Sequence, residues 1–175
     1  MKKNTLQNNV YYRLILACNT LHFKRIAALA KLIWTEHYTA IIGEQQVTYM
    51  LDKFQSLPAI EEQVNQGNSY YLILHQERDA GYFCYSIKNG LLFLSKLYVL
   101  KEFRGKGLAK IALKFMEEQA KAFACNKISL TVNKYNTNSI KAYEKMGFKN
   151  MKAIVQDIGN AYIMDDYLME KEICK

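Results

Sequence analysis

Apolar residues in the first third of the chain follow a strand pattern and then a helical one. The apolar run Val10–Cys18 suits a strand. A helix is expected next, because apolar residues recur at helical spacing along one face: Ile26, Leu29, Ala30, Ile33 and Trp34. Asn19 or Thr20 is the expected N-cap of that helix. A second helix is predicted from Glu44 to Phe54, and Pro58 ends it and opens a third.

The middle of the chain reads as consecutive strands joined by tight turns. Tyr70–His75 is one predicted strand, Asp79–Gly81 is a predicted turn, and the next strand runs from Gly81 to Ile87. Asn89-Gly90 between two apolar runs is a strong hairpin signal, because both residue types tolerate a positive φ. The strand after this turn is expected from Leu91 to Leu100.

The last third returns to alternating helices and strands. After a turn that contains glycine, helices are predicted from Leu108 to Cys125 and from Thr137 to Met146, with a short strand at Ile128–Val132 between them. Two final strands are expected, about Lys149–Ile158 and Tyr162–Glu172. The order predicts an α/β (α+β) fold with a mixed, mostly antiparallel sheet of six to seven strands flanked by helices.

Composition agrees with one globular domain over residues 1–175. Half of the 175 residues are apolar, there is a single proline, and no repeat or linker interrupts the pattern. The four cysteines are widely spaced, so neither a disulfide framework nor a zinc site is indicated, no metal is expected, and the thiols are read as reduced in a cytoplasmic protein. Residues 1–9 are polar and unlike a signal peptide, and no stretch is long enough to span a membrane.

The net charge of +8 admits two interpretations. A basic protein can bind nucleic acid, and this remains an alternative function. The excess between Lys101 and Lys127 is modest, however, and would equally suit a small, highly anionic ligand such as CoA. Nucleic acid is therefore not the expected partner.

A glycine-bearing turn precedes the predicted helix that starts at Leu108. Its residues are Arg104, Gly105, Lys106, Gly107, Leu108 and Ala109. A turn at a helix N-terminus offers free backbone N–H groups and the positive end of the helix dipole, and small residues let a phosphate approach. The turn can therefore cradle a pyrophosphate, although a glycine-rich connection without a ligand would look the same. The spacing matches neither a Walker A loop nor a dinucleotide fingerprint.

A second candidate segment lies around the helix predicted at 137–146. Ser139 and Tyr143 are four residues apart and so share one helix face, and Gly147 suits the residue after the helix end. Asn136 precedes the helix and could be simply its N-cap. Tyr143 could likewise be an ordinary half-buried aromatic residue.

Together these segments resemble the GNAT superfamily of N-acetyltransferases. The turn follows that family's acetyl-CoA motif, Q/R-x-x-G-x-G/A, at every constrained position, and the spacing to Gly147-Phe148 is also typical. The resemblance implies a GNAT-type sheet, and acetyl-CoA as co-substrate. It implies that the backbone of Leu97, Tyr98 and Val99 pairs with the pantetheine arm and that the turn from Arg104 to Ala109 holds the pyrophosphate.

The same resemblance assigns roles in the second segment. Asn136 would hydrogen-bond the cofactor, with Ser139 beside it, and Tyr143 would protonate the departing thiolate. A thiol of pKa about 8.5 and a phenol of pKa about 10 make that proton transfer nearly balanced. The expected reaction is direct attack of a primary amine on the thioester. The protein is expected to be a monomer or a homodimer. A CoA-binding module with little turnover is the alternative within this fold.

The acceptor and the general base are less constrained. The C-terminal residues and the 36–54 segment resemble the PaiA-like branch, whose members are described as polyamine acetyltransferases, and four carboxylates could attract such a cation: Asp157, Asp165, Asp166 and Glu170. They could also be surface charges. Members of that branch tend to carry acidic residues before the cofactor turn, whereas this chain has Phe93-Leu94-Ser95-Lys96. The base would then be Glu36, another carboxylate, or a water chain ending at Ser95.

Overall fold

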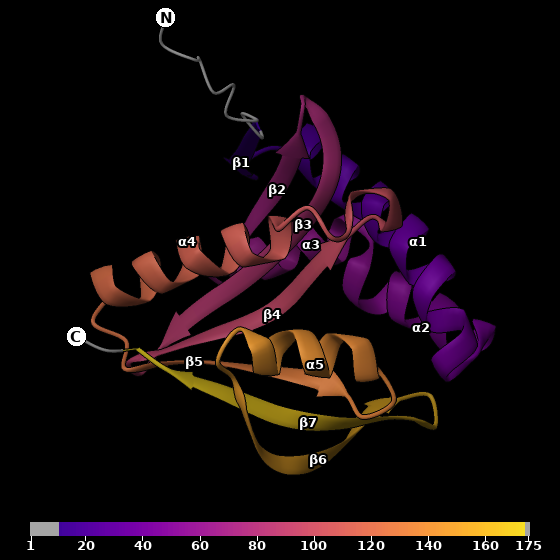
Figure 1. Ribbon diagram of the computed structural model, residues 1–175. Coiled ribbons are helices and arrows are strands. Elements are labelled where there is room, and N and C mark those ends of the chain that lie inside the picture. The colour runs from indigo at the N-terminus through magenta and orange to yellow at the C-terminus, as the bar shows by residue number, and fades with distance from the viewer. Residues whose placement is uncertain (1–10, 174–175) are drawn as a thin grey trace, which may run out of the picture.

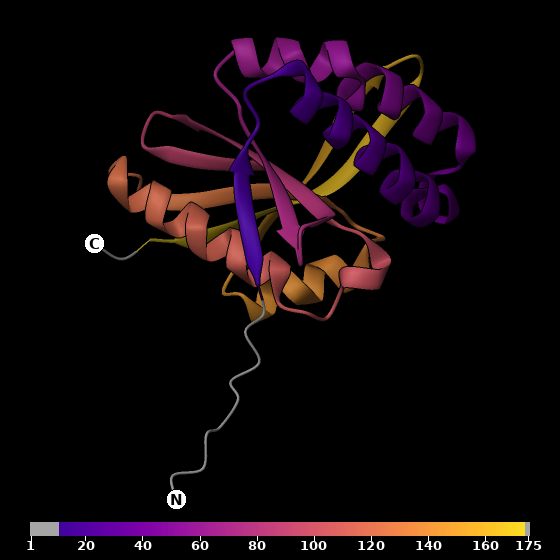
Figure 2. The ribbon, with the colours of Figure 1, turned by 90° about the horizontal axis from the view of Figure 1, so that it is seen from above.

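A computed structural model describes residues 11–173 and contains one twisted seven-stranded sheet with helices on both faces (Figures 1 and 2). The strands are β1 (Tyr12–Leu16), β2 (Ser69–His75), β3 (Arg78–Lys88), β4 (Leu91–Val99), β5 (Lys127–Asn133), β6 (Lys149–Gly159) and β7 (Tyr162–Glu172). The α-helices are α1 (Thr20–Ile42), α2 (Glu44–Gln55), α3 (Leu57–Asn65), α4 (Leu108–Ala122) and α5 (Thr137–Lys145). A short 3₁₀ turn, η1 (Lys101–Phe103), precedes the glycine-bearing turn from Arg104 to Ala109.

The sheet has the order β1-β2-β3-β4-β5-β7-β6 and confirms the predicted mixed, mostly antiparallel class. Its one parallel pair is β4 with β5, which connect through α4. Their register is short: it begins at Leu91↔Lys127 and ends at Leu94↔Leu130. Beyond that point the two strands separate, as Figure 1 shows where β4 and β5 diverge toward their arrowheads.

Helices α1, α2 and α3 cover one face of the β1–β4 half. The apolar face predicted for α1 is buried there, with Ile26 and Ala30 fully enclosed, and Asn19 is its N-cap because its side chain accepts from the His22 amide at 2.9 Å. Alternate residues of β2 point to opposite faces of the sheet, and they are buried on both faces because each face is covered. Tyr70 and Leu72 pack against these helices, whereas Ile73 belongs to the opposite core.

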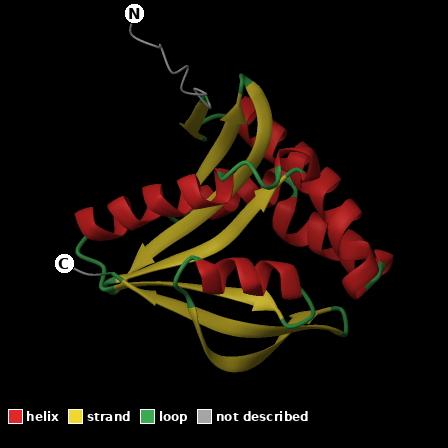
Figure 3. Cartoon of the chain, in the orientation of Figure 1, coloured by secondary structure: helices red, strands yellow, loops and turns green. Residues whose placement is uncertain are grey.

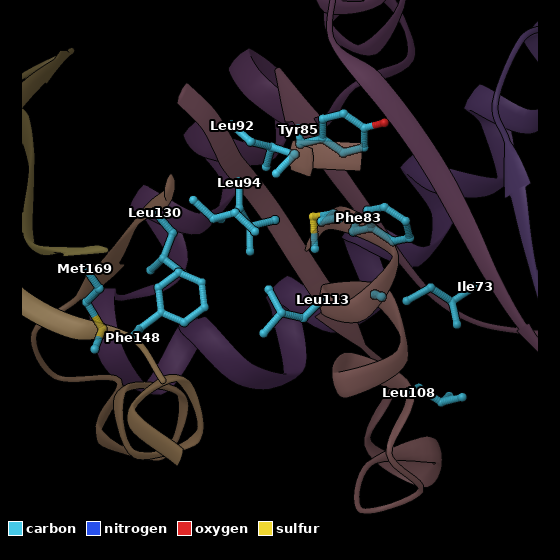
Figure 4. Close-up of a cluster of buried hydrophobic side chains, with 14 of the residues drawn as sticks. Ile73, Phe83, Tyr85, Leu92, Leu94, Leu108, Leu113, Leu130, Phe148 and Met169 are labelled. Carbon is cyan, nitrogen blue, oxygen red and sulfur yellow. The ribbon is translucent and has the colours of Figure 1, made fainter. Parts of the chain in front are cut away.

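Helices α4 and α5 cover the other face, and Figure 3 shows the sheet crossing between the two sets of helices. Leu108 and Leu113 of α4 belong to one buried cluster with Phe83 and Leu94 of the sheet, and Phe148, just after α5, joins the same cluster near Leu130 (Figure 4). This core fixes the start of α4 against β4, and that contact positions the turn before α4.

One predicted turn is wrong. Asp79–Gly81 lies inside β3, and the chain reverses instead at Gln76 and Glu77, whose φ angles are 51° and 61°. Gly81 is needed for close packing rather than for a turn, because a Cβ there would collide with the Tyr98 carbonyl oxygen of β4. Asp79 is held by Arg25 of α1, whose Nε donates at 3.0 Å.

The other predicted elements are confirmed to within a few residues. Asn89 and Gly90 form the hairpin turn with φ of 52° and 70°, and Gly147 follows α5 with φ of 92°. Val10, with which the first strand was expected to begin, lies outside the described residues, as do the polar segment 1–9 and Cys174. The three described cysteines, Cys18, Cys84 and Cys125, are free thiols.

Candidate active site

A cavity of about 390 Å³ opens where β4 and β5 separate, between α1, α5 and β7. Eight of the twelve residues expected at the site line it: Leu97, Tyr98, Val99, Arg104, Ala109, Asn136, Ser139 and Tyr143. The other four, Gly105, Lys106, Gly107 and Leu108, belong to the adjoining turn and lie outside the lining. The two sequence segments are therefore brought together in space.

The split gives β4 an edge inside the sheet. On one side Leu97, Tyr98 and Val99 pair with β3. On the other side the ladder with β5 has already ended at Leu94. Backbone groups on this side of β4 face the cavity, where an extended molecule can hydrogen-bond to them as a neighbouring strand would.

The turn before α4 has the geometry of an anion cradle. Gly105 and Gly107 have φ of 76° and 79°, a left-handed conformation that glycine adopts without steric cost. Gly107 is the N-cap of α4, and no side chain caps that helix end. A Cβ at either glycine would meet no atom within 4 Å, so the space over the backbone is open. Free N–H groups, the helix dipole and open space together suit a phosphate.

The charged side chains of this turn are drawn away from its backbone. Arg104 donates from Nε to the Val99 carbonyl oxygen at 3.0 Å, which joins the turn to the end of β4. The Lys106 ammonium lies 5.0 Å from the centre of the Phe103 ring. Leu108 is 2% exposed, so its side chain belongs to the core and only its backbone can contact a ligand.

Helix α5 brings its N-terminus and Tyr143 to the cavity. Asn136 is the N-cap, as its Oδ1 accepts from the Ser139 amide at 3.4 Å, and its Nδ2 donates to the Tyr38 hydroxyl at 3.4 Å. Tyr143 packs edge-on against Phe148, with ring centres 5.5 Å apart. Burial, followed by the nearby Tyr38, raises the pKa of Tyr143, so its hydroxyl keeps its proton at neutral pH.

Aromatic residues from α1 form a wall that the sequence reading did not assign to the site. The Trp34 and Tyr38 rings are 4.5 Å apart between centres and tilted by 31°. The ring centre of Tyr98 in β4 lies 5.7 Å from that of Trp34 and 6.1 Å from that of Tyr38. All three line the cavity. The signal was present, because Tyr38 follows Trp34 by four residues and so continues the apolar face of the helix.

The four carboxylates that could attract a cationic acceptor occupy different environments. Asp157 accepts from the Gly159 amide at 2.7 Å in the β6–β7 turn, Glu170 accepts from Lys127 at 2.8 Å, and Asp165 pairs with Lys134. Only Asp166 among them lines the cavity. Glu36, the first alternative base, lies outside the lining and pairs with Lys101 at 3.5 Å, whereas Ser95 lines the cavity.

Lys96 lies in the part of β4, residues 93–96, that has no carboxylate. The residue is 7% exposed, and its ammonium donates to the Phe54 carbonyl oxygen and to Gln63 Oε1, both at 2.8 Å, and to the Tyr70 hydroxyl. Burial lowers its pKa to about 8. The Lys96 side chain thus joins β4 to α2 and α3.

Two further classes of site have no support within residues 11–173. No group of three or more His, Cys, Asp or Glu side chains there could hold a metal ion. Over the same residues, no helix has the length and the apolar character that crossing a bilayer requires.

A model of the acetyltransferase (GNAT) family matches residues 26–148, which include most of α1, the strands β4 and β5, the turn before α4 and α5. A probable spermine N(1)-acetyltransferase of Bacillus subtilis subsp. natto is 33% identical over 63 residues. That segment covers 35% of this chain and 41% of the relative, so the match spans less than half of either protein.

Solved structures share the whole fold. The PaiA N-acetyltransferase of Thermoplasma acidophilum, crystallised with coenzyme A, has a TM-score of 0.75 at 20% identity and covers 93% of this chain and 99% of its own. A spermidine N-acetyltransferase chimera from Vibrio cholerae has a TM-score of 0.67 at 19% identity and covers 92% and 95%. At such identities the likeness establishes the architecture alone.

Proposed function

This chain belongs to the acetyltransferase (GNAT) family, and on that premise we propose that it transfers an acetyl group from acetyl-CoA to a primary amine. The observation that carries the proposal is the meeting of the split between β4 and β5 with the uncapped N-terminus of α4. The split suits an extended amide-bearing arm, and the helix end suits the pyrophosphate that follows such an arm.

The residues present fit acetyl-CoA. Backbone groups of Leu97 to Val99 would pair with the pantetheine amides, and the open backbone at Gly105 and Gly107 would receive the phosphates. Asn136 already uses one oxygen as a helix cap, so its contact with the cofactor would come from its remaining hydrogen-bonding capacity. When bound, acetyl-CoA supplies an activated thioester carbonyl.

In the proposed reaction the chain orients an amine and manages the protons. Backbone N–H groups at the β4 edge would stabilise negative charge that develops on the thioester oxygen. The Tyr143 hydroxyl, protonated because burial raises its pKa, would donate to the thiolate as it leaves. Its high pKa also favours rapid return of a proton to the phenolate, so that Tyr143 ends each cycle as it began.

For the acceptor we propose a polyamine such as spermidine or spermine. The aromatic wall of Trp34, Tyr38 and Tyr98 supplies ring faces that attract a cation, and Asp166 adds a negative charge in the same cavity. The relative from B. subtilis subsp. natto carries a spermine acetyltransferase name, which agrees with this choice.

The test is steady-state release of CoA thiol with a panel of amines: spermidine, spermine, aminoglycosides, amino acids and peptides with free N-termini. Turnover with the two polyamines, at a higher kcat/KM than with the other classes, is the expected result. A protein that binds acetyl-CoA but releases no thiol with any amine would instead be a CoA-binding module. A marked preference for another class would redirect the acceptor assignment while leaving the reaction type intact.

A further inference from the structure

Asp166 occupies an unusual place for a charged residue. It lies in β7, the strand next to the sheet edge, and is paired with Asn133 of β5 and Ile154 of β6. The residue is only 4% exposed, yet it lines the cavity. Within residues 11–173 it is the one carboxylate that does so. Among the described residues it is therefore the carboxylate that the cavity lining offers to a positive charge.

The carboxylate of Asp166 is incompletely satisfied. Its Oδ1 is buried and has no hydrogen-bond partner among the described residues. The buried Oδ1 of its sequence neighbour Asp165 differs, because it forms an ion pair with the Lys134 ammonium. Buried carboxylate oxygens are normally paired, and a lone one at a ligand cavity indicates a missing donor.

The surroundings of Asp166 are suited to a cationic donor. The aromatic wall lines the same cavity. Burial raises the pKa of the Tyr38 hydroxyl, and the nearby Asp166 charge adds a smaller rise. An ammonium group can then bind ring faces through cation–π attraction while it donates to the carboxylate. A neutral donor could hydrogen-bond to the carboxylate, but it would lack the charge attraction and the cation–π contact, and an anion would be repelled.

We infer that Asp166 receives the ammonium group of the acceptor amine and takes one of its protons, acting as the general base. This rests on the proposed acetyl transfer. The step balances: a proton moves from R-NH₃⁺ to the carboxylate, and the neutral amine nitrogen then forms the bond to the acetyl carbon as the carbon–sulfur bond breaks. The second nitrogen proton is lost as the amide forms. It replaces the proton that Tyr143 gives to the thiolate, and Asp166 returns its proton to solvent.

The protonation state of Asp166 suits this role. Burial raises its pKa to about 6, hydrogen bonding from Thr131 opposes that shift, and the charges of Asp165 and Lys134 have smaller, opposite effects. The other titratable side chains around the cavity are Tyr38 and His37 of α1, Lys96 and Tyr98 of β4, Arg104, and Tyr143 of α5. At pH 7 the carboxylate is mostly ionised, and its pKa is closer to neutrality than that of an exposed carboxylate.

The experiment compares Asp166→Asn with the matched control Asp165→Asn, using acetyl-CoA and spermidine. Asp166→Asn is expected to lower kcat/KM by about 10²-fold or more, as loss of a general base does, and to remove the acid limb of the pH profile near pH 6. Acetyl-CoA affinity, measured by calorimetry, stays within about twofold, since the cofactor turn is untouched. Asp165→Asn is expected to change kcat/KM by less than about threefold.

Stability gives a readout that a structural role would not produce. Replacing a buried, incompletely paired carboxylate with the isosteric amide should leave the thermal midpoint unchanged or raise it, while activity falls. If the asparagine variant fails to fold, Asp166→Ala is taken through the same measurements. Equal activity of the Asp166 and Asp165 variants, or wild-type kcat/KM in Asp166→Asn, overturns the inference.

Binding separates this inference from the proposed function. Spermidine is titrated into the CoA-saturated wild type and into Asp166→Asn, and at least a tenfold weaker affinity is expected for the variant. If the wild type binds spermidine in this Asp166-dependent way but never turns over, acetyl transfer fails and only the ammonium site stands. If the wild type turns over and the variant matches it, the base assignment fails alone. A wild type that binds no amine overturns the site itself.

Discussion

The left-handed glycine at the start of α4 allows a direct test of the cofactor cradle. Gly107 has φ of 79°, and among residues 11–173 no atom lies within 4 Å of a Cβ placed there. In Gly107→Val the new side chain therefore encounters only what binds in that space. We expect acetyl-CoA affinity to fall by more than tenfold, which is about 1.4 kcal/mol, because the methyl groups hold the phosphate away from the backbone N–H groups.

Backbone strain complicates such a variant, and the chain offers a matched control for it. A non-glycine residue in the left-handed region costs roughly 1–2 kcal/mol, and more when it is β-branched. Gly90 in the β3–β4 turn has φ of 70°, also has no atom within 4 Å of a Cβ, and does not line the cavity. Gly90→Val should lose a similar amount of stability and retain wild-type affinity.

The assay is isothermal calorimetry of acetyl-CoA with the wild type and both variants, alongside urea unfolding of each protein. A selective loss of affinity in Gly107→Val supports the cradle. The reasoning is refuted if Gly107→Val binds acetyl-CoA as the wild type does. It is equally refuted if Gly90→Val loses as much affinity, since the effect would then be one of general stability.

Three single substitutions test other parts of the structure. Tyr143→Phe should keep the fold and the acetyl-CoA affinity but lower kcat by about 10²–10⁴-fold where chemistry limits the rate. The loss should be smaller for a thioester whose thiol has a lower pKa. An unchanged kcat in pre-steady-state measurements would make Tyr143 a packing residue. Lys96 has a folded pKa of about 8, below its ordinary value of 10.5, so the unfolded state binds more protons between those values and the unfolding free energy rises with pH. From pH 8 to 9.5 the wild type should gain about 1–2 kcal/mol of unfolding free energy relative to Lys96→Met, in a window below the Cys84 pKa of about 12, and an unchanged difference would contradict the burial of a charged lysine. Gly81→Ala should lower the unfolding free energy by about 1–3 kcal/mol more than Gly90→Ala in urea titrations, because its Cβ would overlap the Tyr98 carbonyl oxygen of β4, and equal losses would mean that the strands yield freely.

Local patterns were enough to predict most of the elements. The helical spacing in α1, the Asn89-Gly90 turn and the glycine after α5 each determine a local conformation, and each is confirmed. The Gln76–Glu77 turn could not be anticipated, because neither residue has a side chain that favours a positive φ. The turn predicted at Gly81 was wrong because this glycine is needed where β3 approaches β4 closely, a contact that the local sequence does not reveal.

The candidate site divides along the same line. The turn from Arg104 to Ala109 and the α5 segment are contiguous motifs, and each contributes residues to the cavity lining; their roles toward a cofactor stay predictions. The environment of each carboxylate depends instead on strand pairing, which sets Asp166 opposite Asn133 inside the sheet and leaves Asp165 with Lys134. Two adjacent aspartates are indistinguishable in the sequence, and only the register separates them.

The divergence of β4 and β5 also bears on self-association. An unpaired strand edge at the rim of a sheet can recruit the sheet of another molecule, which is a common route to aggregation. Here the rim strands are a five-residue β1 and a β6 that carries Lys149 and Lys152, both of which discourage such pairing. The unfinished edge lies in the interior instead, with protein on either side, where a slender chain can enter but a second sheet cannot. The fold can therefore keep part of its sheet incomplete for a ligand without exposing that part to its own copies.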